Sequence, residues 1–181
     1  MEQAGVDRRT AVGLALAAGL APTAAAAESV TAPALDYVFG ATVTLGAPLE
    51  LGTVRGVRRR FVPITGGTVS GPRLTGVVLA GGGDRQDIGD DGVSIIHARY
   101  LLRAADGATI GVDNPGVRVA SPEVIARLTA GEDVPPDLYY FRTTPVFEPP
   151  PGSHDWLRRS VFVCQGVRRP TTVEVRVFRV A

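Results

Sequence analysis

Residues 60–84 constrain the fold of this chain more than any other stretch. Two β-like segments end there in the glycine-rich stretches Gly66-Gly67 and Gly81-Gly82-Gly83, and Asp84 follows the second. Glycine within strand-rich sequence marks a bulge, a kink or a close approach of two backbones. The pattern predicts a curved sheet such as a barrel wall, with the Asp84 carboxylate inside a pocket. The alternative for Asp84 is a residue that only closes a turn through its side chain.

The chain beyond residue 34 has the pattern of many short strands and one helix. The helix is expected after the N-cap residue Ser121, with Pro122 at its first position and Gly131 at its end. This combination favours an all-β fold: an antiparallel, closed or nearly closed lipocalin-like β-barrel of about eight or nine strands, large enough for one small ligand. A β-sandwich is the alternative. The expected strands are Leu35–Leu45, Leu49–Val54, Arg58–Thr65, Leu74–Ala80, Val93–Arg103, Ala108–Val112, Tyr139–Phe147, Ser160–Gln165 and Thr172–Val180.

The first residues have the pattern of an export signal. Arg8-Arg9 precede a short apolar stretch that is followed by the small-residue run Ala24–Ala27. The paired arginines favour the twin-arginine route, and an ordinary secretory signal is the alternative. We therefore expect a signal peptide at residues 1–27 and one β-barrel domain at residues 28–181. The mature protein is expected to be periplasmic or extracellular, with no stable membrane span.

Composition excludes several classes of function. The net charge of +1 argues against a nucleic-acid partner, and the absence of lysine excludes Schiff-base catalysis. Cys164 is the single cysteine and lies in an apolar run, where we expect a small buried hydrophobe. With one cysteine and two histidines we expect no metal site, and we expect no cofactor. A small molecule remains as the expected partner, with the oligomeric state left open.

Strand alternation in Val93–Arg103 places His97 and Arg99 on one face, opposite the face of Ile96 and Tyr100. If the mixed face lines the barrel, His97 and Arg99 are the few polar groups that orient a ligand in an apolar cavity. If that face is exposed to solvent, the apolar face is the core instead.

Two further sites have the same ambiguity. Arg142 and Glu148 fall on one side of a strand-like segment, either as a surface pair or at the mouth of the barrel. Trp156 is either a lid over the pocket or an anchor in the core.

Many short motifs occur in order and together cover the chain from about Leu35 to Val180. The motifs are Arg60…Val62-Pro63-Ile64-Thr65-Gly66-Gly67, Gly71-Pro72-Arg73-Leu74, Gly81–Asp84, Asp91-Gly92, Ala98-Arg99-Tyr100, Asp106-Gly107, Tyr140-Phe141-Arg142, Phe147-Glu148 and Trp156-Leu157. They are similar to those of the bacterial and fungal family catalogued as domain of unknown function 3237.

The resemblance implies a lipocalin-like barrel with polar family residues around an internal pocket, at Asp84, Arg99, Tyr100, Arg142 and Glu148. The chain departs from the family pattern at two positions. Arg85 stands where tryptophan is common, and Arg158 stands where asparagine is common. If these arginines line the pocket, the ligand is more polar or anionic than is usual for the family. If they lie at the rim of the pocket, they imply nothing about the ligand.

The leading functional hypothesis is an exported barrel that binds a small oxygenated organic molecule. Asp84 or His97 would act as general acid or base, while Arg99 or Arg142 stabilises an enolate or carboxylate. Such a site suits isomerisation, cyclisation or hydration next to a carbonyl. The alternatives are a non-catalytic carrier and a protein-interaction module. The expected ligand-binding residues are Arg60, Tyr100, Arg142, Glu148 and Trp156.

Overall fold

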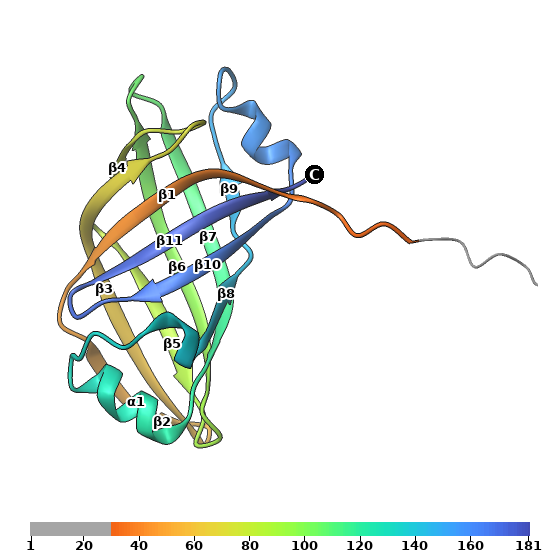
Figure 1. Ribbon diagram of the computed structural model, residues 1–181. Helices are drawn as coiled ribbons and strands as arrows, with labels where there is room; N and C mark the ends of the chain where they lie inside the picture. Colours follow the sequence, from red (N-terminus) through yellow and green to blue (C-terminus); the bar gives the residue numbers. More distant parts are fainter. Residues whose placement is uncertain (1–29) are drawn as a thin grey trace, which may run out of the picture. The chain divides into compact units, whose positions relative to one another are not determined.

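Residues 30–181 are described by the structure, a computed structural model (Figure 1). Within them, Pro33–Ala181 folds as one unit. The expected export signal at residues 1–27 lies outside the described residues and stays a prediction. In the described part of the chain, no helix combines the length and the apolar character needed to cross a membrane.

Strands make up most of the regular secondary structure of this unit. Helical structure is confined to α1 (Pro122–Thr129) and two short 3-10 turns, η1 (Pro136–Leu138) and η2 (Asp155–Arg159). The strands are β1 (Leu35–Leu45), β2 (Leu49–Val54), β3 (Val57–Ser70), β4 (Gly76–Val78), β5 (Gly82–Ile88), β6 (Val93–Ala104), β7 (Thr109–Val119), β8 (Tyr140–Thr143), β9 (Val146–Glu148), β10 (Phe162–Arg168) and β11 (Thr172–Val180).

Eight strands close into an antiparallel ring in the order β6-β5-β3-β1-β11-β10-β8-β7, and β7 pairs back to β6. Three further strands add to this ring. Strand β4 pairs with β3 and β6 beyond the start of β5, β9 pairs with β7, and β2 forms a hairpin with β3. Closure leaves the ring without exposed edges. The expected closed all-β barrel is confirmed.

Glycines allow β3 to bend while it changes partners. Ile64 pairs with Gly82 of β5, and Gly67 pairs with Val78 of β4. At Gly67 φ is 147°, and a Cβ atom would lie 2.1 Å from the carbonyl oxygen of Thr42. Only glycine therefore fits this close approach. The expected kink is present, but in the middle of one 14-residue strand and not between two segments.

The two ends of the barrel are filled differently. At one end, aromatic rings pack edge to face, with ring centroids 5.8 Å apart for Phe39 and Phe147 and 5.1 Å apart for Phe147 and Phe162. At the other end, α1 packs Val124 and Leu128 into a separate buried cluster. The helix begins as expected, since the Ser121 hydroxyl accepts a hydrogen bond of 3.3 Å from the amide of Val124. Space remains between these two packed ends.

Candidate polar cavity inside the barrel

The barrel contains a cavity of about 250 Å³, lined by strand residues such as Tyr100 and Asn114 and by Ile125 and Leu128 of α1. Five polar or charged side chains are buried among the described residues, and all five line this cavity. They are Gln86, Ser94, Asn114, Arg118 and Thr143. Burial of polar groups costs free energy unless they are paired, so a barrel that needed only a stable core would not collect them here. The cavity is therefore the candidate functional site.

Strand register arranges the inward-facing side chains in layers. Ala98 of β6 pairs with Asp84 of β5 on one side and with Asn114 of β7 on the other. Closer to α1, Ser94 of β6 pairs with Arg118 of β7. Because side chains alternate between faces, residues two and four positions apart point into the same cavity. A deep layer with Asp84 and Asn114 thus lies below an outer layer with Arg118.

A chain of hydrogen bonds holds Asp84 in the cavity wall. The Nε atom of Arg60 donates to Oε1 of Gln86 at 2.8 Å, and Nε2 of Gln86 donates to Oδ2 of Asp84. The backbone amide of His97 donates to Oδ1 of Asp84 at 3.2 Å. Burial raises the pKa of Asp84, although the Gln86 hydrogen bond and the charge of Arg118 oppose the rise. This carboxyl group can therefore hold a proton at a higher pH than an exposed aspartate.

Two guanidinium groups face the same space. Arg118 is 7% exposed, and no hydrogen bond joins its guanidinium to another described residue. Burial and the neighbouring Arg60 lower the pKa of Arg118 to about 10, so it stays charged at neutral pH. Burial also lowers the pKa of Arg60, which uses only its Nε atom in the bond to Gln86. Both groups can stabilise negative charge on a bound molecule.

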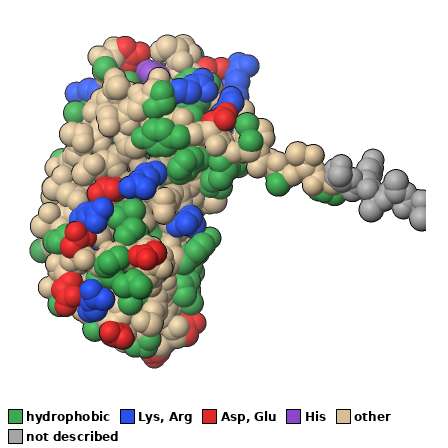
Figure 2. Space-filling view, viewed as in Figure 1, with side chains coloured by type: hydrophobic (Ala, Val, Ile, Leu, Met, Phe, Trp, Pro, Cys, Tyr) green, Lys and Arg blue, Asp and Glu red, His purple; other side chains and the backbone are tan. Residues whose placement is uncertain are grey.

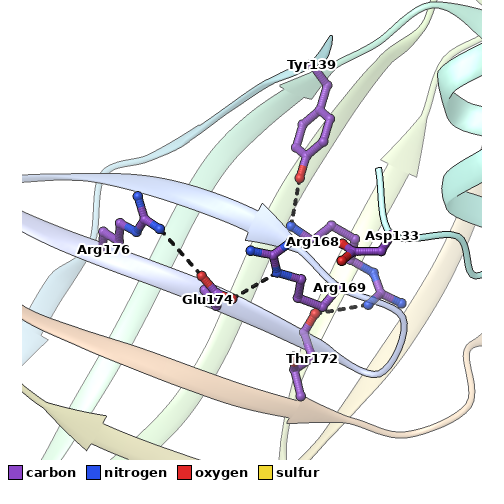
Figure 3. A network of polar contacts seen from close by, with 7 residues as sticks. All are labelled: Asp133, Tyr139, Arg168, Arg169, Thr172, Glu174 and Arg176. Carbon is purple, nitrogen blue, oxygen red and sulfur yellow. Dashed lines mark hydrogen bonds and ion pairs between the residues drawn. The ribbon is translucent and has the colours of Figure 1, made fainter. Parts of the chain in front are cut away.

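A polar network fixes the chain around the mouth of the cavity (Figure 3). Arg168 donates to the carbonyl oxygens of Thr172 at 3.0 Å and Pro170 at 3.1 Å, which closes the turn between β10 and β11. Its backbone amide donates to the Tyr139 hydroxyl at 2.9 Å. The segment after α1 is held in place by the ion pair of Asp133 with Arg169, also 2.9 Å. The mouth is therefore built from elements held by hydrogen bonds and an ion pair, and both terminal nitrogens of the Arg168 guanidinium donate to the turn.

Neutral polar groups occupy the deep end of the cavity. Burial raises the pKa of Tyr100, and it raises the pKa of Cys164 to about 12, so both groups stay protonated at neutral pH. Asn114 lies beside Tyr100, and Thr143 lies beside Cys164. Neither Oδ1 of Asn114 nor Oγ1 of Thr143 has a hydrogen-bond partner among the described residues.

Three of the expected site residues line the cavity: Asp84, Arg60 and Tyr100. His97 and Arg99 do not. Both side chains lie on the outer face of β6, where Asp113 contacts Nε2 of His97 at 2.5 Å and the Arg99 guanidinium at 2.7 Å. The pocket placement expected for them is corrected, because the face of β6 with Ile96 and Tyr100 is the inner one.

Arg142, Glu148 and Trp156 also lie away from the cavity. Arg142 is exposed, donates to the carbonyl oxygen of Phe141 at 2.9 Å and lies 5.1 Å from the ring centre of Tyr140. Glu148 is exposed beside Gly111 on the outer surface. Neither residue reaches the mouth of the barrel.

Trp156 packs against the aromatic core, 5.8 Å from Phe162 between ring centroids, with the Arg73 guanidinium 4.0 Å above its ring. Of the two interpretations of Trp156, the structure shows the anchor.

The two arginines at which the chain departs from the family pattern are surface residues. Arg85 is exposed on the outer face of β5. Arg158 is exposed and forms an ion pair with Asp155. These positions therefore carry no information about the ligand.

Sequence reasoning missed Gln86, Asn114 and Arg118, which all line the cavity. The alternation of Ile110, Val112, Asn114 and Arg118 is visible in the sequence, and extending the strand beyond Val112 would have found the last two. Among the residues that the structure describes, no three His, Cys, Asp or Glu side chains group as metal ligands.

A closed antiparallel ring of eight strands around a partly polar cavity defines the class of small β-barrels. Residues 33–180 match the family model described as a protein of unknown function, DUF3237. The chain belongs to this family, as its motifs predicted.

Relatives with high coverage support this assignment. A UPF0311 protein from Clostridium acetobutylicum is 39% identical over 147 residues, which cover 81% of this chain and 93% of the relative. A solved structure of a conserved protein of unknown function from Rhodopseudomonas palustris superposes with a TM-score of 0.81 at 34% identity, covering 84% of this chain and 100% of that one. A β-barrel-like protein from Acinetobacter baumannii superposes with a TM-score of 0.73 at 35% identity, over 84% and 99% of the two chains.

A fungal relative has a more specific name. A hydroalkoxylation enzyme from Penicillium herquei is 32% identical over 80 residues, which cover 44% of this chain and 53% of that enzyme. A solved structure of an enzyme from the same fungus superposes with a TM-score of 0.60 at 21% identity, over 83% and 98% of the two chains. The latter similarity establishes a shared fold.

Proposed function

We propose that this barrel is a cofactor-independent acid–base catalyst for a small oxygenated organic molecule held in the cavity. The observation that carries this proposal is Asp84, a cavity-lining carboxyl group with a raised pKa, between Arg60 and Arg118. A general acid must carry a proton when the substrate binds, and burial shifts the pKa of Asp84 in the direction that favours its protonated form. The arginines supply positive charge where an oxyanion would develop.

The reaction class that we favour is the addition of a hydroxyl group across a C=C bond conjugated to a carbonyl. The hydroxyl oxygen bonds to the alkene carbon farther from the carbonyl, which moves negative charge onto the carbonyl oxygen as an enolate, and protonated Asp84 then gives its proton to the carbon next to the carbonyl. The hydroxyl proton returns to Asp84. One O–H bond and one C–C π bond break, one C–O and one C–H bond form, and nothing is oxidised. Arg118 and Arg60 stabilise the enolate oxygen during the transfer.

The fungal hydroalkoxylation enzyme supports this choice, because its name describes the same type of addition. The match covers 44% of this chain, so the cavity residues and not the relative define the proposed roles.

Two synthetic probes test the proposal: 6-hydroxyhex-2-enoic acid and its methyl ester, which cyclise to tetrahydrofuran-2-ylacetic acid and its ester. We expect the protein to accelerate at least one cyclisation and to give one product enantiomer in excess. Asp84→Asn should slow it by about 10²–10⁴-fold, the usual contribution of a positioned acid or base. Asp113→Asn, which changes a carboxyl on the outer face, is the matched control. Racemic product at the buffer rate from both probes would count against acid–base addition.

A non-catalytic carrier is the second candidate, because both oxygens of Asp84 already accept hydrogen bonds, from Gln86 and His97. In a carrier Asp84 would only complete the cavity wall. Ligand-dependent thermal stabilisation without any turnover, unchanged in Asp84→Asn, would favour this function over catalysis.

A further inference from the structure

Positive charge in the cavity exceeds what its own side chains neutralise. Four arginines line it, whereas Asp84 is the one carboxyl group among the lining residues. Arg58 forms an ion pair with Glu50 at 3.0 Å, and Arg168 donates to the carbonyl oxygens of Thr172 and Pro170. Arg118 faces Asp84 as its acidic neighbour, and Arg60 shares Asp84 while Glu50, already paired with Arg58, also favours its charge. A buried charge without a full partner is costly, so the cavity favours an anionic guest.

Hydrogen-bond donors in this region are in excess as well. A guanidinium has five N–H groups, and those of Arg118 have no acceptor among the described residues. Arg60 uses one N–H group, in its bond to Gln86. The planar fork of a guanidinium matches the two oxygens of a carboxylate. A carboxylate group is therefore the anion that these two side chains fit.

Acceptors are in excess at the deep end. Oδ1 of Asn114 and Oγ1 of Thr143 are unpartnered among the described residues, and both residues are 4% exposed. A buried acceptor without a donor carries its full desolvation cost. A hydroxyl group of a ligand would supply the missing donor.

Between these two ends the wall is mostly apolar, and Gln86, which pairs with Ile96 midway, already bonds to Arg60 and Asp84. Asn114 and Arg118 lie four residues apart on β7, which separates their Cα atoms by about 13 Å along the strand. Ile96, Phe141 and Val175 line the same cavity. The arrangement suits a molecule with polar groups at both ends and an apolar middle.

We propose that the cavity binds a hydroxy-carboxylate: an organic anion whose carboxylate is held by Arg118 and Arg60 and whose hydroxyl group donates to Asn114 Oδ1. This inference rests on the proposed function in using the same cavity, and it specifies the ligand class. It also sets the direction of binding, with the anionic end towards the mouth and the hydroxyl end beside Tyr100.

Binding by isothermal titration calorimetry tests the proposal with three probes of different length: 4-hydroxybenzoate, 4-hydroxyphenylacetate and 4-hydroxycinnamate. For the probe that binds best, the matching carboxamide should bind at least about tenfold more weakly, because it removes the charge. The analogue without the hydroxyl group should bind about tenfold more weakly, because Asn114 Oδ1 stays unpaired.

Two arginine variants locate the anion. Arg118→Met should abolish the preference for carboxylate over carboxamide and raise the melting temperature of the unliganded protein, because it removes a buried charge without a full partner. Arg103→Met, on the outer face of β6, should change neither quantity. A lower melting temperature in Arg118→Met with the preference intact would assign Arg118 a structural role and overturn the proposal.

Failure of this inference is distinguishable from failure of the proposed function. Binding is measured at equilibrium with probes that are not asked to react, and it is repeated in Asp84→Asn. Selective binding of a hydroxy-carboxylate without turnover of any probe supports the ligand class and counts against catalysis. Equal binding of carboxylate and carboxamide, or no binding by any of the three acids, overturns the ligand class even if the neutral ester is cyclised.

Discussion

Polar groups on the two faces of β6 differ in whether they have hydrogen-bond partners. On the outer face, His97 and Arg99 both bond to Asp113, and water reaches all three side chains. On the inner face, Tyr100 lies beside Asn114, whose Oδ1 atom has no partner among the described residues. The polar side chains on the outer face are paired with one another, whereas the inner face retains a buried oxygen atom that a ligand could pair. Buried polar atoms without a hydrogen-bond partner therefore distinguish a candidate site from the surface better than the presence of titratable residues does.

The surface around β1, β10 and β11 resembles the outer face of β6. Figure 2 shows acidic and basic side chains interspersed with hydrophobic ones over this side of the barrel. Several of these charges are paired, such as Arg179 with Asp36 at 2.7 Å and Arg169 with Glu174 at 2.9 Å. Exposed pairs of this kind contribute little to stability.

The largest expected contrast between the faces is in packing. Leu102 points inward and is 2% exposed, whereas its neighbour Leu101 points outward and is 47% exposed. Leu102→Ala should lower the free energy of unfolding by about 2–5 kcal/mol, because it leaves a cavity in the aromatic end. Leu101→Ala should change it by less than about 0.5 kcal/mol. Urea unfolding of both variants measures the difference, and equal losses would mean that the two faces are assigned incorrectly.

The carboxyl groups of Asp84 and Asp113 should give stability opposite dependences on pH. Burial raises the pKa of Asp84, so the folded protein binds this proton more tightly than the unfolded chain does. Its contribution is present below the ordinary value of 3.8 and is lost as the pH rises through the raised pKa. Partial burial raises the pKa of Asp113, but hydrogen bonds from His97 and Arg99 outweigh it and lower the pKa overall. Its contribution is present above 3.8 and is lost as the pH falls.

Urea unfolding from about pH 3 to about pH 8 separates these two effects. Asp84→Asn should remove the loss of stability on the alkaline side and leave the acid side unchanged. Asp113→Asn should do the reverse, with an effect below about 1 kcal/mol because the pair is exposed. If both variants altered the same side of the profile, the comparison between a buried inner carboxyl and an ion-paired outer one would fail.

The smallest effect is expected for His97. Its imidazole lies outside the barrel and 2.5 Å from Asp113, so it has no access to the cavity. His97→Gln should leave the cyclisation rate of the two hexenoate probes within about twofold of the wild type, as expected for a surface substitution. A loss of cyclisation rate comparable to that of Asp84→Asn would make His97 a candidate catalytic group again. Its effect would then have to pass from the outer face through the barrel wall to the cavity.

Much of the barrel could be predicted from the sequence. Leu35–Leu45, Leu49–Val54 and Thr172–Val180 have the predicted bounds, and the helix begins at Ser121 as its capping residues indicate. These segments have local signals: alternation, turn residues and a cap. Strand β5 had no such signal, because Gly81-Gly82-Gly83 before Asp84 is typical of a turn. The neighbouring strands, and not the local sequence, make this segment extended.

The candidate site was predicted less well than the fold. Asp84, Arg60 and Tyr100 were placed correctly in the cavity, whereas the partners of Asp84 were not found. Asn114 and Arg118 were missed because Pro115 lies between them, and a proline within an apolar run argues against a strand. In the structure Pro115 lies on the exposed face of β7, opposite His97, and the strand continues to Val119. Which face of β6 is buried depends on ring closure, and no local pattern contains that information.

The bond between the His97 amide and Asp84 joins the two faces through the backbone. The donor belongs to a residue whose side chain is outside, and the acceptor is a carboxylate inside, 3.2 Å away. The NMR chemical shift of the His97 amide can thus report the charge on and around Asp84 in the cavity. A proton arriving on Asp84, or a charged guest arriving beside it, should move the resonance of amide 97 while its neighbours on the outer surface stay still. The His97 amide therefore serves as a probe of the cavity that is already part of the barrel wall, and no probe group has to be introduced into the cavity.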